Sequence, residues 1–149
     1  MFRYFWFVNK KTQLILLVDD DQDDQLLFQE ALTMADGAVR FSSACNGIDA
    51  LEKLQAATQL PDIMVIDVNM PKMNGIDCLK AIKQSDKLQG IPVIMYSTSC
   101  SKECQQDCLD SGAAGFMKKP SDFFELCEKI KQILNLVFSE KPIQMPAIL

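Results

Sequence analysis

The chain has 149 residues, of which 48% are apolar and 23% charged, and it carries a formal net charge of −5 with no histidine. This length and composition are those of one globular domain with a full core. The acidic balance argues against a nucleic-acid partner, because such partners are bound by Lys and Arg. The lack of histidine excludes His-activated nucleophiles and His metal ligands, so any chemistry must come from carboxylates, hydroxyls, lysines or cysteines.

The six cysteines form no CxxC pair, and a chain of this length needs no disulfide framework. We therefore expect six reduced thiols in a cytoplasmic protein. Cys100, Cys104 and Cys108 are spaced to line one helix face. Packing between helix and sheet explains this spacing better than a metal site, because one helix rarely provides tetrahedral geometry.

The first twelve residues are rich in aromatic side chains, but their apolar run is too short for a signal peptide or a membrane span. The aromatic side chains could form a partner or self-association surface, or pack onto the domain, and the sequence does not choose between these.

Five short apolar runs then alternate with stretches of helical spacing. They predict strands at Leu14–Val18, Ala38–Ser42, Ile63–Ile66, Val93–Tyr96 and Gly115–Met117. Four of the runs are nearly continuous, as buried parallel strands are. The alternation predicts an α/β fold with five βα units over residues 13–138, helices on both faces of a parallel sheet, and tails at 1–12 and 139–149.

Polar residues follow four of these predicted strands. The first strand is followed by Asp19-Asp20-Asp21, the third by Asp67, the fourth by Ser97-Thr98-Ser99 and the fifth by Lys118-Lys119-Pro120. In an open parallel sheet, ligands bind beyond the carboxyl ends of the strands, near the switch in strand order. With strand order 2-1-3-4-5, several carboxylates, a hydroxyl and an ammonium group converge at this edge.

Crowded carboxylates repel each other, and burial strengthens the repulsion. A divalent cation with oxygen ligands removes this cost, and Mg²⁺ favours a few carboxylates together with water and phosphate oxygens. Asp67 can act as a nucleophile without a general base. Lys119 adds positive charge and Ser97 adds a hydrogen-bond donor, so the set suits a phosphoryl group on a carboxylate.

Four motifs at this edge carry a family resemblance. Together they resemble the motif set of response-regulator receiver domains, over most of the chain. The motifs are ILLVDDD at 15–21, VIDVNMPKMNG at 65–75, PVIMYSTS at 92–99 and GFMKKP at 115–120. The resemblance implies the flavodoxin-like form of the fold, with strand order 2-1-3-4-5. Residues 82–99 also resemble stand-alone receivers that serve phytochrome-type kinases.

Carried over position by position, the resemblance implies that Asp67 is the phosphoacceptor. Asp19 and Asp20 match the acidic pair of the Mg²⁺ site, with Asp20 as a direct ligand. The backbone carbonyl of Asn69 matches the third protein ligand.

The remaining positions of the motif set concern phosphate binding and signal output. Ser97 matches the switch hydroxyl and Lys119 the lysine that pairs with the phosphate. Phe116 matches the switch aromatic, whose ring we expect to turn from an exposed to a buried rotamer when Ser97 moves towards Asp67. The resemblance also implies a cis peptide bond between Lys119 and Pro120.

The implied function is that of a phosphorelay receiver, which takes a phosphoryl group from a sensor histidine kinase or a phosphotransfer protein. It is not an enzyme acting on other substrates. We expect the output to pass by protein contacts through the fourth helix, fifth strand and fifth helix, about residues 100–135. No nucleic-acid or membrane partner is expected, and a homodimer is possible.

Three alternatives are open to tests. A degenerate receiver would bind partners without phosphorylation. An aspartyl-phosphate phosphatase would need a second carboxylate two residues after Asp67, where this chain has Asn69. A flavodoxin-type cofactor binder would need a loop that cradles phosphate, which Asp19-Asp20-Asp21 would repel. For Asp23 and Asp24, stabilisation of a helix N-terminus is an alternative explanation to a role in the site.

Overall fold

The computed structural model describes residues 13–138 and 148–149. Five parallel strands form one sheet in the order β2-β1-β3-β4-β5, as predicted. The strands are β1 (Leu14–Val18), β2 (Arg40–Ala44), β3 (Ile63–Asp67), β4 (Val93–Ser97) and β5 (Gly115–Lys118). The helices are α2 (Gln22–Ala35), α3 (Gly47–Ala56), α4 (Gly75–Gln84), α5 (Lys102–Asp110) and α6 (Phe123–Phe138).

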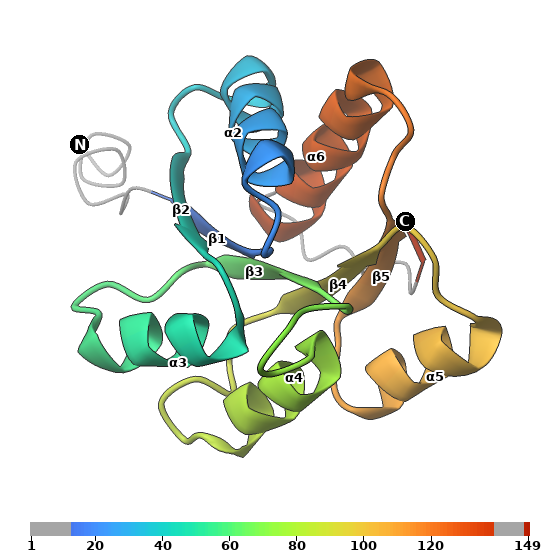
Figure 1. Cartoon of the computed structure of the whole chain (residues 1–149). Helices are drawn as coiled ribbons and strands as arrows, with labels where there is room; N and C mark the ends of the chain where they lie inside the picture. Colours follow the sequence, from blue (N-terminus) through green and yellow to red (C-terminus); the bar gives the residue numbers. More distant parts are fainter. Residues whose placement is uncertain (1–12, 139–147) are drawn as a thin grey trace.

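The helices cover both faces of the sheet (Figure 1). Helices α2 and α6 lie together on one face, and α3, α4 and α5 lie on the other. Each face has its own apolar cluster, because alternate residues of each strand point to opposite sides. Strand β3 is buried along its whole length, which explains why its sequence is continuously apolar up to Asp67.

The second strand begins two residues later than predicted, at Arg40 instead of Ala38. The residues before it form a turn in which the N–H of Ala38 donates to the Asp36 carboxylate at 3.0 Å. Arg40 then pairs with Leu14 at the start of β1. The turn uses the backbone groups that a longer strand would need, so the weak apolar run alone placed the strand too early.

The C-terminal residues 148–149 lie beside β5, where Ile148 forms a parallel bridge with Phe116. The Leu149 N–H donates to the Phe116 carbonyl at 2.9 Å. The N-terminal tail, with its aromatic side chains, lies outside the described residues. None of the helices in the described part is long and apolar enough to cross a membrane.

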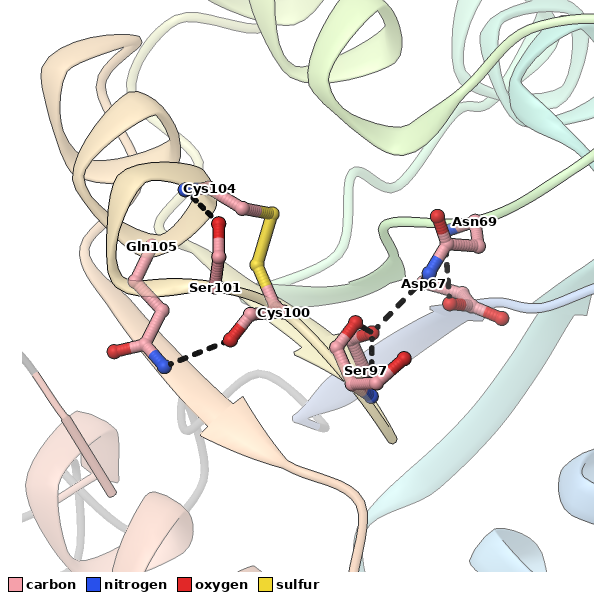
Figure 2. Close-up of a disulfide and its surroundings, with 8 residues drawn as sticks. Asp67, Asn69, Ser97, Cys100, Ser101, Cys104 and Gln105 are labelled. Carbon is pink, nitrogen blue, oxygen red and sulfur yellow. Dashed lines mark hydrogen bonds between the residues drawn. A yellow bond between two sulfur atoms is a disulfide. The ribbon is translucent and has the colours of Figure 1, made fainter.

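The expectation of six free thiols is wrong for two of them, because Cys100 and Cys104 form a disulfide (Figure 2). Helix α5 begins at Lys102 with Ser101 as its N-cap, so Cys100 lies in the loop before the helix and not on its face. The Cα atoms of Cys100 and Cys104 lie 5.5 Å apart across this helix start, close enough for the bond. The predicted packing role is confirmed, since Cys100, Cys104 and Cys108 all contact the cluster on the α3–α5 face.

The segment between β3 and α4 turns tightly beside the predicted site. Lys72 adopts a left-handed conformation with φ 66°, and the N–H of Gly75 donates to the Val68 carbonyl at 2.9 Å. A Cβ atom at Gly75 would overlap the backbone carbonyl of Asp67. A glycine is therefore required here, because the first turn of α4 packs directly on the backbone of the proposed acceptor residue.

Replacing Gly75 with Ala should destabilise the protein, because the clash is with backbone that cannot rotate away. We expect a loss of about 1–3 kcal/mol in the free energy of unfolding, as for other overpacked sites. Gly90→Ala is the matched control, since a Cβ there has no neighbour within 4 Å. Chemical denaturation of both variants measures the difference, and equal stabilities would contradict the close approach.

Candidate functional site

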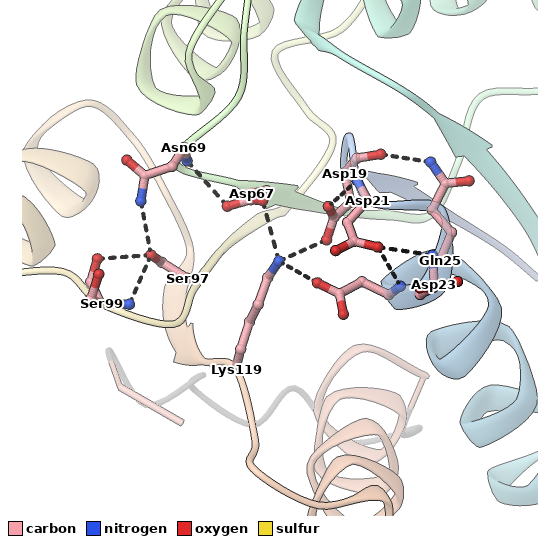
Figure 3. Close-up of polar contacts among 10 residues, drawn as sticks. Asp19, Asp21, Asp23, Gln25, Asp67, Asn69, Ser97, Ser99 and Lys119 are labelled. Carbon is pink, nitrogen blue, oxygen red and sulfur yellow. Dashed lines mark hydrogen bonds and ion pairs between the residues drawn. The ribbon is translucent and has the colours of Figure 1, made fainter.

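The site is built at the carboxyl edge of the sheet, where β1 and β3 lie side by side (Figure 3). Asp19 follows β1 directly and is fully buried, and Asp67 ends β3 with 6% of its surface exposed. Asp20 is exposed beside them. One carboxylate oxygen from each of the three residues lies within 4.8 Å of the others. The predicted convergence of these residues is confirmed.

The Lys119 ammonium group lies between the carboxylates and contacts three of them. Its Nζ donates to Asp19 and Asp24 at 2.9 Å and to Asp67 at 3.2 Å. The same Nζ lies 5.1 Å from the centre of the Tyr96 ring, within range of a cation–π interaction. The side chain is only 11% exposed, so these contacts are weakly screened by water.

Lys119 reaches this position from a trans peptide bond, since the described residues contain no cis bond. The expected cis bond between Lys119 and Pro120 is therefore wrong. The resemblance implies the cis bond because the turn that it forms would aim the lysine at Asp67. The backbone of β5 already does this, because the Lys119 N–H donates to the Ser97 carbonyl at 2.8 Å and holds the residue in register beyond the strand.

The contact between Asp24 and Lys119 was not predicted from the sequence. Its position in the first turn of α2 offered a favourable interaction with the helix dipole as one explanation and identified no partner. The N-cap Asp21 accepts from the N–H groups of Asp23 and Asp24, which starts α2 directly after the acidic loop. That start turns Asp24 towards Lys119, whereas the ion pairs of Lys119 within the described residues do not include Asp23 on the same turn. Spacing along the chain could have suggested the pair only once the helix start was known.

The site holds more negative than positive charge. Four carboxylates, from Asp19, Asp20, Asp24 and Asp67, face the one ammonium group of Lys119, so the formal sum is 1 − 4 = −3. Burial raises the pKa of Asp19 to about 6, although an N–H from Asp21 and the Lys119 ammonium group both lower it. Burial lowers the pKa of Lys119, but the carboxylates of Asp19, Asp24 and Asp67 outweigh this effect and raise it.

This donor set fits a hard divalent cation. All three converging side chains offer oxygen, the ligand atom that Mg²⁺ prefers, and the surplus of negative charge would be reduced by its binding. Asn69 lies on the loop beyond β3, and its N–H donates to Asp67 at 3.1 Å. This contact holds the loop that carries the Asn69 carbonyl, the predicted third ligand, next to the acidic cluster.

Ser97 ends β4 and is 1% exposed. Its hydroxyl donates to the Ser99 carbonyl at 2.9 Å and accepts from the Ser99 N–H at 3.3 Å and from the Asn69 side chain at 3.4 Å. The hydroxyl is thus held by the β4–α5 loop on one side and by the β3–α4 loop on the other. A rotation towards Asp67 would have to break its bond to Ser99.

Phe116 does not match the expected switch geometry. We expected an exposed ring as long as Ser97 is turned away from Asp67, but the residue is 2% exposed while Ser97 bonds Ser99. The ring belongs to the apolar cluster on the α3–α5 face. Phenylalanine has no hydroxyl that would draw the ring towards water, so burial is its lowest-energy position.

The raised pKa of Asp19 predicts a pH-dependent cost to stability. The native state holds this proton more tightly than the unfolded chain, so stability is lost as pH rises from about 4 to about 6. In the presence of a chelator, Asp19→Asn should be more stable than the wild type by about 3 kcal/mol at pH 8, with the gap closing near pH 4.

Urea denaturation at both pH values measures this gap. Asp86→Asn serves as the control, because Asp86 is exposed and far from the site in sequence. A variant that is less stable than the wild type at pH 8 would show that the contact between Asp19 and Lys119 outweighs the cost of burial.

Comparison with known proteins agrees with this geometry. The family model of the response regulator receiver domain matches residues 15–131. The chain is 33% identical to the chemotaxis protein CheY of Treponema pallidum, covering 81% of this chain and 82% of that protein. It is 37% identical to a protein-glutamate methylesterase/protein-glutamine glutaminase of Bacillus subtilis, over 80% of this chain but only a third (33%) of the relative.

Solved structures show the same fold. The phosphorylated cyanobacterial phytochrome response regulator RcpA superposes with a TM-score of 0.81 at 27% identity, covering 88% of this chain and 97% of that one. The Mn²⁺-bound response regulator Rcp1 superposes with a TM-score of 0.76 at 25% identity, covering 91% and 99%. The fold, the convergent acidic edge and these matches together show that this chain belongs to the response regulator receiver domain family.

Proposed function

We propose that this receiver accepts a phosphoryl group on Asp67 with Mg²⁺ bound beside it, and signals by protein contacts. The observation that carries the proposal is the buried Lys119 ammonium group, which contacts Asp67 and the neighbouring carboxylates. Mg²⁺ would be held by Asp19, Asp20, Asp67 and the Asn69 carbonyl, and would supply positive charge for the phosphoryl oxygens.

The donor is a phosphohistidine on a sensor kinase or a phosphotransfer protein. An oxygen of the Asp67 carboxylate attacks the phosphorus, the P–N bond breaks, and an acyl phosphate forms on Asp67. Lys119 pairs with one phosphoryl oxygen, and the Ser97 hydroxyl can donate to another after releasing Ser99. A carboxylate needs no base for this attack, which agrees with a chain that lacks histidine.

The face made by α2 and α6 suits the protein that brings the phosphoryl group. Large apolar side chains are exposed on these helices: Leu26 (60%) and Met34 (67%) on α2, which line a surface hollow together with Phe123, and Phe124 (79%) on α6. Helix α2 begins at Gln22, directly after the acidic loop, so a partner on this face would lie next to Asp67. Exposed apolar clusters of this kind are typical of protein contacts.

Transfer from a kinase places the protein in the cytoplasm, and we propose no catalytic activity towards other substrates. The degenerate receiver is disfavoured because the acceptor, the acidic pair and the lysine converge. The phosphatase alternative needs a second carboxylate near the acceptor, but the Asn69 side chain occupies that position and donates to Ser97.

Phosphorylation of Asp67 can be tested with a small phosphodonor. Incubation with acetyl phosphate and Mg²⁺ should raise the intact mass by one phosphoryl group. Asp67→Asn should show no gain, because the amide is not a nucleophile of comparable strength. Asp62→Asn is a suitable control, since Asp62 lies at the opposite end of β3. A full gain in the Asp67 variant would refute the assignment.

The proposed Mg²⁺ site predicts that substitutions of the acidic residues around it reduce Mg²⁺ affinity by different amounts. Asp20→Ala should weaken Mg²⁺ binding by at least about tenfold, since even indirect partners of metal ligands are worth that much. Asp23→Ala removes the same charge from an exposed position on α2 and should change the affinity far less. Calorimetric titration compares the two, and equal losses would indicate general electrostatic attraction without direct ligation.

A further inference from the structure

The disulfide between Cys100 and Cys104 closes a small covalent ring at the start of α5 (Figure 2). Cys100 lies in the loop after β4, and the N-cap Ser101 accepts from the Cys104 N–H at 3.1 Å. The Gln105 side chain also donates to the Cys100 carbonyl at 3.3 Å. The bond therefore fastens the end of the β4–α5 loop to the first turn of α5.

This ring begins next to the backbone group that holds Ser97. The Ser97 hydroxyl donates to the Ser99 carbonyl at 2.9 Å, and Ser99 directly precedes Cys100. If Ser97 is to donate to a phosphoryl group on Asp67, this bond must break, and residues 98–100 must move. The disulfide fixes the far end of that segment, because a crosslink removes conformations from the loop that it closes.

The position of the pair distinguishes it from the other four cysteines. Cys78, Cys108 and Cys127 are buried. Burial raises the pKa of Cys78 to about 11 and also raises that of Cys108, so both stay protonated. Cys45 is exposed and free.

The bonded pair, by contrast, is partly exposed where the β4–α5 loop meets the first turn of α5. Cys100 and Cys104 are half-buried, and Ser99, Ser101 and Lys102 around them are exposed. Thiol–disulfide exchange requires that a small thiol reach a sulfur, and from the partial exposure of both residues we infer this access. In a cytoplasmic protein a disulfide is usually transient or redox-sensing, because the thiol pool reduces unprotected bonds.

We propose that Cys100 and Cys104 form a reversible redox-modification site that controls how strongly phosphorylation of Asp67 changes helix α5. The proposal rests on the proposed function of Asp67. In the oxidised protein, the ring anchors residues 98–100 and Ser97 stays bonded to Ser99. In the reduced protein, the loop is free to follow Ser97 towards Asp67, and the change reaches α5.

The reactant is a low-molecular-weight thiol of the glutathione class. Its thiolate attacks one sulfur, the bond between Cys100 and Cys104 breaks, and the leaving sulfur takes up a proton while a mixed disulfide forms. A second thiol then attacks the mixed disulfide and frees the other cysteine. Two thiols are oxidised to one disulfide and supply two electrons and two protons to the protein. The oxidised form of the same couple reverses the exchange.

The test uses the full chain in two redox states, prepared with oxidised glutathione or with dithiothreitol that is then removed. Alkylation under denaturing conditions should add four groups to the oxidised protein and six to the reduced protein. Six groups in both preparations would overturn the proposal, because no bond would then form under a glutathione couple.

Each state is then titrated with beryllofluoride and Mg²⁺ as a phosphoryl mimic, and amide NMR shifts are recorded. Residues beside the acceptor, such as Val68 and Asn69, should shift in both states. Residues 98–110 should shift at least twice as far in the reduced state. Cys104→Ser and Cys100→Ser should behave as reduced under both conditions, while Cys45→Ser should keep the redox dependence.

The proposed function of Asp67 and the redox control of α5 are refuted by different results. If no residue near Asp67 responds in either state, the proposed function is wrong, and the redox control with it. If Val68 and Asn69 respond but residues 98–110 shift equally in both states, the acceptor assignment stands and the redox control is overturned.

Discussion

The structure depends on one buried ammonium group among carboxylates. Lys119 contacts Asp19, Asp24 and Asp67, which belong to three different segments of the chain. Without this charge, the ends of β1 and β3 would place two buried carboxylates side by side, and their repulsion would oppose the pairing of the strands. The sheet order and the position of Lys119 beyond β5 therefore support each other.

The same lysine leaves the site partly unneutralised. One positive charge against four carboxylates leaves room for a divalent cation, and the raised pKa of Asp19 shows that burial is not fully compensated by the lysine and the hydrogen bonds. In the protein without a bound cation, the repulsion between these carboxylates destabilises the folded state. Cation binding relieves that destabilisation. This is the physical reason why a receiver can couple metal binding and phosphoryl acceptance at one edge of a sheet.

In the proposed mechanism, output from this site follows the β4–α5 loop more directly than the position of Phe116. Phe116 is already packed in the core, whereas Ser97 makes two hydrogen bonds with Ser99 on one loop and one with Asn69 on another. The N-cap Ser101 and the disulfide lie immediately beyond, at the start of α5. A change at the Ser97 hydroxyl therefore has a short path to this helix, and the covalent ring lies on that path.

Much of this protein could be read from local patterns. The apolar runs predicted five strands because fully buried parallel strands cannot alternate with polar residues, and only the weak second strand was misplaced. The residues after the strands predicted the acidic cluster, since parallel strands bring their carboxyl ends to one edge. Asp19, Asp20, Asp67, Ser97 and Lys119 were all found there.

Other features were decided only by the tertiary structure. The contact between Asp24 and Lys119 depends on where α2 begins and how it is turned. The bond before Pro120 is trans, unlike the form that the family resemblance implied. The disulfide depends on α5 beginning at Lys102, which leaves Cys100 outside the helix that spacing alone assigned to it. Local sequence determines which residues are buried or charged, but contacts between segments also depend on the start and rotation of each helix, which the packing of the whole domain sets.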